Sequence, residues 1–600
     1  MRDQHYLKLL AEKYPTEQLV EQELVKMTAA LSLPKGTEYF FSDLHGEHEA
    51  FIHLLRSASG VIRDKIEIVF GQSLLESDRA ELASLIYYAE QQLIYKKKTC
   101  PRYYEWCEIT LNRLVKVCRE VSAKYSREKV RKTMDEEWAS ILEELLYVDE
   151  DIDTLRYHRS MISACIEAGA ADQVIISLCA LIRQISIDHL HIIGDIFDRG
   201  PRADRIMDEL MKYHDVDIQW GNHDVSWIGA VCGNRVCVAN VLRIATRYNN
   251  FDLLEDGYGI NLRPLSAFAV IQFKLEGQLV GKYPEFQMDD RKLLDKIDFV
   301  KQTVRVGAKT YPMRDCSFPT VDAQSPYTLT AEEEALMEQL AASFRHSTAL
   351  KRHIEYLFSH GAMYKATNGN LLYHGCVPML PDGAFDQWEF DGRQYSGKRL
   401  FDFMDSSIRE AYFNGTARDI DLIWYWWCGA KSPLYGKSAM TAFERYFIAD
   451  KSTYEELANP YYDLYDDPAV CRRILDEFGL QGDHVHIVNG HVPVRQGENP
   501  VKAQGMLYII DGGISKAYQS KTGIGGYTLI YNSHYIALAE HQKFVPGDED
   551  AVPSERYAKI RVVEMMPKRR TIAETDVGVV WQQRIEKLKQ LLQSMRAGRI

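Results

Sequence analysis

The sequence predicts an α/β fold, because segments typical of strands, loops and helices follow one another in that order along the chain. Residues 189–195 are an apolar, β-branched run that ends in a Gly-Asp loop, and residues 202–212 have helical spacing. Residues 216–222 repeat the passage from strand to loop. Functional side chains of α/β folds lie where strands end, so we expect a site at these loops.

The same order of elements occurs near the N-terminus. Residues 37–43 are typical of a short buried strand that runs into a loop. From Gly46 onward, Phe51, Leu54 and Leu55 fall on one face of a helix. This segment therefore predicts a further strand, loop and helix.

Two insertions are predicted. Residues 74–98 and 104–169 are rich in Leu, Glu, Lys and Arg at helical spacing and contain few Gly or Pro residues, which predicts a large helical insertion. Residues 286–343 are also charged and helical in pattern, around an irregular stretch at 312–325. This second segment is either a lid over a substrate site or an ordinary peripheral insertion, and the sequence slightly favours the peripheral insertion.

The remaining elements return to the strand pattern. Apolar runs at 371–374, 485–491 and 505–511 each end in polar residues, residues 527–538 predict a hairpin, and residues 573–600 predict a helix with a basic end. The expected organisation is a first part of the core at 1–70, a helical insertion at 71–170, a second part of the core at 171–285, an insertion at 286–345, a third part of the core with substrate loops at 346–540 and a C-terminal extension at 541–600.

Composition excludes several classes of protein. With 46% hydrophobic and 26% charged residues, the 600-residue chain is neither disordered nor fibrous. A net charge of −13 argues against broad nucleic-acid binding. An anionic small-molecule substrate remains compatible with it, because a local basic pocket or a metal can override the global sign. The sequence leaves open whether the chain forms a homo-oligomer.

Cysteine usage and apolar runs predict the compartment. The 11 cysteines are an odd number and include no CxxC pair, which indicates free thiols in a reducing environment. The charged N-terminus lacks the apolar segment of a secretion signal, and residues 421–428 are too short an apolar run to span a bilayer. We expect a cytoplasmic protein with no membrane partner.

Five short motifs carry the candidate chemistry, and each follows a strand-like run. In chain order they are Asp43-Leu-His45-Gly, Gly194-Asp195-Ile-Phe-Asp198-Arg199-Gly200, Gly221-Asn222-His223-Asp224, Tyr373-His374-Gly375 and Asn489-Gly490-His491. Their side chains supply nitrogen and oxygen ligands that suit Mn²⁺, Fe²⁺ or Zn²⁺. Any one motif alone is weak, but five in order behind strands predict a metal site.

The physical interpretation is a site for two divalent ions. Such ions can share a carboxylate and a bridging hydroxide, and only a carboxylate offers lone pairs to both. Glycines beside Asp195, Asn222, His374 and His491 permit sharp turns and close approach. Arg199 directly follows the Gly-Asp loop, where its guanidinium could bind a phosphoryl group.

At this point the sequence resembles the binuclear metallophosphoesterases, whose motifs are DxH, GDxxDRG, GNH(D/E), H and GH. The resemblance implies a β-sandwich flanked by helices, here with a large helical insertion. It also implies these roles: Asp43 and His45 bind the first metal, Asp195 bridges, Asn222, His374 and His491 bind the second metal, Arg199 binds phosphate, and His223 is the general acid, oriented by Asp198.

A closer resemblance covers nearly the whole chain. The stretches WGNHDVSWIGAVCGN, IWYWWCGAKSPLYGK, NGHVPV and IDGGISKAYQSKTGIGGYTLIYNS are similar to the class III bacterial fructose-1,6-bisphosphatases, as is the long helical segment between the first two motifs. This family implies hydrolysis of the 1-phosphate of fructose 1,6-bisphosphate in gluconeogenesis, with two metals, Mn²⁺ by association. The implied mechanism is in-line attack by a metal-bridging hydroxide. The final motif is GHVP rather than GHxH, as in the phosphoprotein-phosphatase branch.

The phosphate on C6 needs its own cations. The candidates are Lys431, Lys437, Lys516 and Lys521, with Lys431 and Lys516 favoured by their loops. Each is as readily a solvated surface lysine.

Other interpretations are weaker. Residues 429–438 end in Gly-Lys-Ser but lack the spacing of a phosphate loop. The tryptophans at 424, 426 and 427 are more typical of core than of a sugar platform, and Cys376 has no base to activate it. A protein Ser/Thr phosphatase with the same metal site, or a non-catalytic scaffold of the same fold, are the alternative functions.

Overall fold

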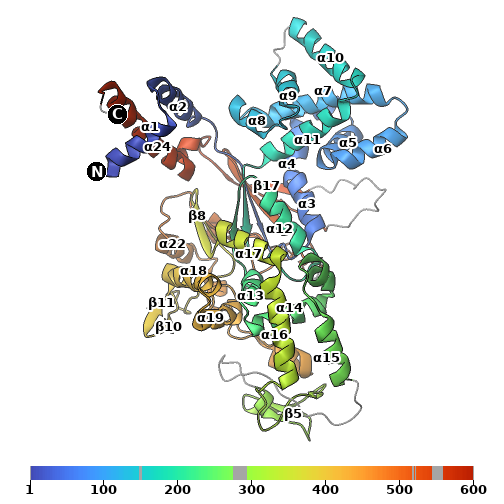
Figure 1. The fold of residues 1–600 in the computed structure, drawn as a ribbon, viewed down its shortest axis with the longest axis vertical. Helices are drawn as coiled ribbons and strands as arrows, with labels where there is room; N and C mark the ends of the chain where they lie inside the picture. Colours follow the sequence, from blue (N-terminus) through green and yellow to red (C-terminus); the bar gives the residue numbers. More distant parts are fainter. Residues whose placement is uncertain are drawn as a thin grey trace. The chain divides into compact units, whose positions relative to one another are not determined.

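The computed structural model describes residues 2–147, 152–273, 293–511, 513–516, 519, 522–543 and 558–598 (Figure 1). Lys521 lies outside these residues. The chain forms two compact units. The first comprises Met1–Phe40, Glu49–Leu190 and Gly525–Ile600, and the second comprises Phe41–His48 and His191–Ile524.

The sheet of the first unit is antiparallel. Its strands run in the order β17-β16-β15-β1 and have these bounds: β1 (Glu38–Ser42), β15 (Tyr527–Tyr531), β16 (Tyr535–Glu540) and β17 (Lys559–Met565). Tyr39 of β1 is paired with Ile530 of β15. The pairing of Tyr527 with Glu540 confirms the predicted hairpin.

Helices make up the rest of the first unit. After α3 (His48–Arg56) come α4 (Val61–Phe70), α5 (Glu76–Tyr87), α6 (Ala89–Thr99), α7 (Tyr103–Ser122), α8 (Arg127–Thr133), α9 (Ala139–Leu146), α10 (Ile152–Glu167) and α11 (Ala171–Ser186). Figure 1 shows α5 to α11 grouped as a bundle. Buried faces of α7 and α11, with Leu114 and Leu178 fully enclosed, form its core. The predicted helical region is confirmed.

The chain ends pack together within the first unit. Helices α1 (Arg2–Lys13), α2 (Glu17–Ala30) and α24 (Asp576–Arg596) share an apolar cluster that includes Val20, Leu588 and Leu591. This confirms the predicted C-terminal helix. Within the described residues, no single helix is long and apolar enough to cross a membrane. Helices Leu155–Glu167 and Ala171–Ser186 meet these two criteria only when taken together, and that pair is bent by 118°.

The second unit holds the parallel strands. One sheet contributes β2 (His189–Ile193), β3 (Val216–Gln219) and β7 (Gly361–Ala362) in that order. A five-stranded sheet has the order β13-β14-β12-β9-β8, with β8 (Tyr364–Thr367), β9 (Asn370–Tyr373), β12 (His486–Asn489), β13 (Val501–Lys502) and β14 (Leu507–Ile509). Strand β12 lies between β9 and β14 and is parallel to both, with Val488 opposite Leu372 and Tyr508. The chain is therefore a mixed α/β protein with several sheets.

The helices of the second unit surround these strands. They are α12 (Ala203–Lys212), α13 (Asn222–Val231), α14 (Arg235–Tyr248), α15 (Arg263–Phe273), α16 (Ala331–His346), α17 (Thr348–His360), α18 (Gly397–Phe413), α19 (Ala417–Cys428), α20 (Ala442–Phe447), α21 (Tyr461–Leu464) and α22 (Pro468–Glu477). A two-stranded ribbon, β10 (Trp388–Phe390) and β11 (Arg393–Tyr395), precedes α18. Helix α13 is buried along its length and packs against α14 and α19.

The prediction for residues 286–343 is partly wrong. Residues 274–292 lie outside the described part, but β4 (Ile297–Asp298), β5 (Thr303–Val306) and β6 (Lys309–Pro312) form an antiparallel sheet where a helix was expected. Gly307, with a φ of 58°, closes the turn between β5 and β6. Each of these strands has only two to four residues, so the alternation of Val304 and Val306 with Thr303 and Arg305 is too short to identify a strand. Helix α16 confirms the helical part, and a capping box of Thr330 and Glu333 begins it.

Candidate metal centre

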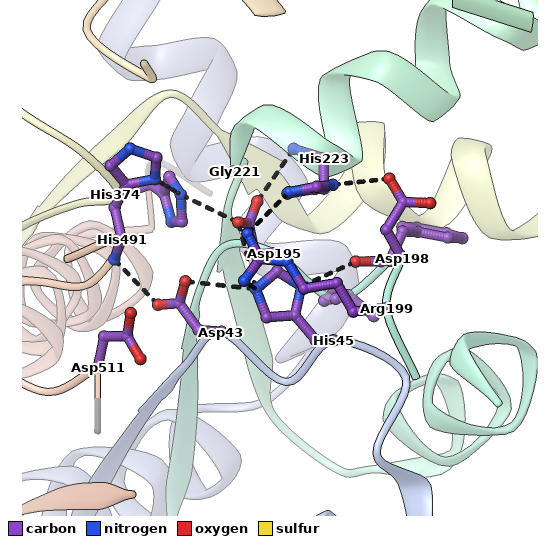
Figure 2. A network of polar contacts seen from close by, with 12 residues as sticks. Asp43, His45, Asp195, Asp198, Arg199, Gly221, His223, His374, His491 and Asp511 are labelled. Atoms are coloured by element: carbon purple, nitrogen blue, oxygen red, sulfur yellow. Dashed lines mark hydrogen bonds and ion pairs between the residues drawn. The ribbon is translucent and has the colours of Figure 1, made fainter. Parts of the chain in front are cut away.

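The loops at the ends of five strands bring the predicted metal ligands together within the second unit. Figure 2 shows the side chains of Asp43, His45, Asp195, His374 and His491 gathered in one place. Asp43 and His45 follow β1, Asp195 follows β2, His374 follows β9, His491 follows β12, and Asn222 begins α13 after β3. Most are fully buried, with Asp195 and His45 each 1% exposed and His374 0%.

Asp195 is the residue that the whole cluster shares. Its Oδ2 atom lies 3.6 Å from Nε2 of His45 and 3.5 Å from Nε2 of His374. Two groups of candidate ligand atoms, each within 4.8 Å of one another, both include it: His45, Asp195 and His223, and Asp195, His374 and His491. A carboxylate in this position can serve two cations at once.

The donor set fits divalent cations. Oδ2 of Asp195 and Oδ1 of Asn222 are buried and have no hydrogen-bond partner among the described residues, a costly state unless something else satisfies them. Nδ1 of His45 lies 3.1 Å from the carbonyl oxygen of Phe197, and Nδ1 of His374 lies 3.1 Å from that of Ile193. These contacts orient each ring so that its Nε2 faces the cluster, as in metal-binding histidines.

The site concentrates buried negative charge. Burial and neighbouring charge raise the pKa of Asp43, and burial together with Asp43 raises the pKa of Asp511 well above its usual range. Burial opposes the charge on Asp195 too, but His374 and His223 hold its pKa well below the ordinary value. Burial also opposes the charge of His374, yet Asp195 and Asp43 raise its pKa to about 10. These carboxylates together favour bound cations.

The loops that carry the site residues also contain strained backbone conformations. Six non-glycine residues of the site have φ between 44° and 69°: Asp43, His45, Asp195, Asp198, Arg199 and His491. Side chains rarely adopt this left-handed conformation, and it persists only where the surrounding structure imposes it. Gly221 allows the closest approach, because a Cβ atom there would lie 2.1 Å from Oδ1 of Asp195. The cluster is held in one geometry by its backbone.

Asp198 holds the ring of His223 in a fixed orientation. Nδ1 of His223 lies 2.6 Å from Oδ2 of Asp198, and Trp227 donates a hydrogen bond of 2.8 Å to the other oxygen of Asp198. Because both oxygens of Asp198 are held, its carboxylate fixes the orientation of the His223 ring. The contact places a ring proton on Nδ1 and leaves Nε2 available for chemistry. Nε2 lies 3.2 Å from a guanidinium nitrogen of Arg199, whose other nitrogen is 2.6 Å from His45.

Two further carboxylates lie in the site, and the sequence analysis gave neither of them a role. Asp224 accepts hydrogen bonds of 2.9 Å from the backbone N–H groups of Gly221, Asp195 and Ile196, and so joins the loops after β2 and β3. The sequence signal for Asp224 was an acidic residue three positions after the N-cap residue Gly221, the position of a capping box. Asp511 is 3% exposed after β14 and faces Asp43 (Figure 2). The sequence signal for Asp511 was the apolar run at 505–511, which ends in this carboxylate.

The predicted phosphate lysines that the structure describes each contact a carboxylate. Lys431 lies 3.0 Å from Asp386, Lys437 lies 3.1 Å from Glu456, and Lys516 lies 3.8 Å from Glu47. All three are between 40% and 51% exposed. Lys437 is near the cluster, because its charge adds to burial and to His374 in lowering the pKa of His491.

Trp426 and Trp427 are buried on α19, as expected for core residues, but Trp427 also borders the site. Its ring centroid lies 4.8 Å from that of His223. Cys376 is buried, and burial raises its pKa to about 12, which agrees with an inert thiol.

The two tryptophans form a matched pair for a stability test. Nε1 of Trp426 donates 2.8 Å to Oγ of Ser407, whereas the buried Nε1 of Trp427 has no acceptor among the described residues. We expect Trp426→Phe to lower the free energy of unfolding by about 1–2 kcal/mol more than Trp427→Phe, because only the first removes a buried hydrogen bond, whereas the second removes a buried donor that has no acceptor. Urea unfolding of both variants measures the difference, and equal losses would contradict it.

Comparisons with known proteins place the chain among phosphatases of sugar phosphates. A family model described as Firmicute fructose-1,6-bisphosphatase matches residues 5–270 and 265–597. Proteins named fructose-1,6-bisphosphatase class 3 from Clostridium novyi and Clostridium botulinum are 45% and 46% identical to this chain. These matches cover 100% and 99% of the chain and 97% of each relative. A relative named fructose-1,6-bisphosphatase class 3 1, from Clostridium beijerinckii, is 44% identical over 99% of the chain and 97% of its own length.

A solved structure also matches, at a greater distance. It is the cold-active protein-tyrosine phosphatase of a psychrophilic Shewanella species, with 12% identity, a TM-score of 0.25, and coverage of 62% of this chain and 69% of that one. Similarity at this level does not establish a shared fold.

Proposed function

The chain belongs to the Firmicute fructose-1,6-bisphosphatase family, and from this premise we propose that the buried cluster around Asp195 hydrolyses the 1-phosphate of fructose 1,6-bisphosphate. The chain is a hydrolase with the activity of a gluconeogenic fructose-1,6-bisphosphatase. The observation that carries the site assignment is the position of Asp195 in both groups of candidate ligands.

Asp195 would be shared by two divalent cations, which we propose to be Mn²⁺. Asp43 and His45 would hold the first, and Asn222, His374 and His491 would hold the second. Bound there, the cations supply charge that polarises the phosphoryl group and a water molecule of lowered pKa. The unpaired oxygens of Asp195 and Asn222 support this assignment.

The other residues bind and protonate the substrate. Arg199 is placed to bind phosphoryl oxygens through its planar guanidinium. His223 donates the proton on Nε2 to the sugar oxygen that leaves from C1, while Asp198 keeps the ring oriented and stabilises its charged form. The contact of 2.6 Å between His223 and Asp198 supports this division of roles.

Coarser features of the chain fit the same family. We infer a metallophosphoesterase-type β-sandwich, supported by site residues that follow strands of both sheets of the second unit, and residues 71–170 as an insertion into it. The lysines at 431, 437, 516 and 521 stay candidates for the C6 phosphate. A cytoplasmic location is supported by eleven cysteines that are all free.

Metal removal tests the proposal directly. We expect exhaustive dialysis against a chelator to abolish hydrolysis of fructose 1,6-bisphosphate, and Mn²⁺ to restore it, because no side chain in the cluster can replace the charge of the cations. Calorimetric titration of the metal-free protein should show two sites. Full activity in metal-free protein would contradict the scheme.

A substrate panel tests the activity itself. Fructose 1,6-bisphosphate, p-nitrophenyl phosphate and a phosphoserine peptide should be compared at equal Mn²⁺. We expect the sugar bisphosphate to have the highest kcat/KM. Preference for the phosphopeptide would instead indicate a protein phosphatase.

A further inference from the structure

Two arginines on one face of α14 converge on a tyrosine of α20. Arg243 and Arg247 are four residues apart, so they project from successive turns of the helix. A guanidinium nitrogen of Arg243 lies 3.3 Å from the hydroxyl of Tyr446, and the guanidinium carbon is 6.0 Å from the ring centroid. Burial would raise the pKa of Tyr446, but the two arginines lower it. Both guanidinium groups are therefore directed to one place.

Neither arginine has an acidic partner in the part of the chain that the structure describes. No carboxylate there lies within 4.0 Å of Arg243 or Arg247, whereas Arg235, at the start of the same helix, pairs with Glu334. Arg243 is half-buried and Arg247 is exposed. Two adjacent cations repel each other, and an anion between them would remove that cost.

Hydrogen bonds connect this arginine pair to the helix that carries the general acid. Arg243 donates 2.8 Å to Oδ1 of Asn240, and Asn240 donates 3.0 Å to Oγ of Ser226. Ser226 lies on α13 three residues after His223, an advance of about 4.5 Å along a helix axis. Arg243 is therefore linked through Asn240 to the helix that carries His223.

Apolar packing makes the same connection on a second path. Ile244, the residue after Arg243, packs in one cluster with Trp427 and Tyr435. The ring of Trp427 lies 4.8 Å from His223, and the carbonyl oxygen of Tyr435 lies 3.1 Å from Nε2 of His491. The buried indole N–H of Trp427 has no acceptor among the described residues.

We propose that Arg243 and Arg247 bind the distal phosphate of the sugar bisphosphate while the phosphate on C1 occupies the metal centre. The inference rests on the proposed function and names the part of that site that selects a bisphosphate. A planar guanidinium fork matches the oxygens of a phosphate monoester, and the hydroxyl of Tyr446 adds a third donor. The described candidate lysines already contact carboxylates, with which a phosphate would have to compete, whereas the arginines do not.

The test separates binding of the distal phosphate from chemistry at the metals. In the Mn²⁺-loaded enzyme, Arg243→Ala and Arg247→Ala should each raise KM for fructose 1,6-bisphosphate roughly tenfold or more, the loss expected for a charge-assisted hydrogen bond to phosphate. Kinetics with p-nitrophenyl phosphate, which has no distal phosphate, should not change. Arg243→Lys should restore part of the lost affinity. The inhibition constant of fructose 6-phosphate should rise in parallel with KM.

Arg235→Ala is the matched control, since it removes a paired arginine from the same helix and should leave KM for both substrates unchanged. Wild-type KM for fructose 1,6-bisphosphate in the double variant Arg243→Ala/Arg247→Ala would overturn the inference and leave the proposed function intact. Equal losses on both substrates with a lower Tm would also overturn it, because they indicate a structural role. A wild-type enzyme that hydrolyses p-nitrophenyl phosphate but not fructose 1,6-bisphosphate would overturn the proposed function instead.

Discussion

Asp195→Asn should reduce kcat by roughly 10³-fold or more, because the substitution removes the one carboxylate that both groups of candidate ligands share. An amide has the same shape and still offers an oxygen to the backbone N–H of His223, which lies 3.0 Å from Oδ1 of Asp195. The fold should therefore survive. The charge that attracts two cations is lost, so both metal sites should weaken together.

Three measurements on Asp195→Asn test whether Asp195 is the shared ligand. Steady-state kinetics with fructose 1,6-bisphosphate give kcat, calorimetric titration with Mn²⁺ gives the number and affinity of the sites, and circular dichroism checks the fold. Asp419→Asn, which alters a buried carboxylate of the same unit that belongs to no group of candidate ligands, is a suitable control for the loss of buried charge. Near-normal Mn²⁺-dependent activity in Asp195→Asn would contradict the shared-ligand role.

His223→Asn should lower kcat for fructose 1,6-bisphosphate by about 10²- to 10⁴-fold, the usual contribution of a general acid. The effect should be much smaller with p-nitrophenyl phosphate, because p-nitrophenolate leaves without a proton. Metal content should be unchanged if His223 is a proton donor and not a ligand. Asp198→Asn should show the same dependence on the leaving group with a smaller loss, because it weakens the orientation and charge stabilisation of the ring but leaves the proton donor in place.

His360→Asn, a surface histidine, is the control for both variants. An equal loss on the two substrates would contradict proton donation by His223. Loss of one Mn²⁺ equivalent in His223→Asn would assign this histidine to a metal instead.

The strands that lead to the site were predictable because they are buried on both faces. Segments such as β2 and β12 contain adjacent β-branched residues, Ile192-Ile193 and Ile487-Val488, and each ends at a polar motif, so both their existence and their approximate bounds follow from the sequence. The strands at 297–312 were mistaken for helix because each spans only two to four residues, too few for the alternation of Val304 and Val306 to outweigh the charged residues around them.

The ligand motifs were visible for a different reason, since metal chemistry restricts residue type and spacing within each loop. Asp224 and Asp511 were missed because their contacts form between loops that are distant in sequence. Arg243 and Arg247 belong to no motif, and only the packing of α14 against neighbouring helices reveals them. A role that depends on which helices pack against each other cannot be predicted from the sequence pattern of one segment.

The backbone N–H of His491 donates 3.0 Å to Oδ2 of Asp43, so the centre closes only when a late segment of the chain reaches an early one. Ribosomes deliver the N-terminal part first, and that part can begin to fold before the rest has emerged. A nascent or prematurely released polypeptide that ends before residue 491 would hold Asp43, Asp195 and His374 without their last partner. Unfinished copies of this enzyme would therefore not consume sugar phosphates, and hydrolysis would begin only with nearly complete translation.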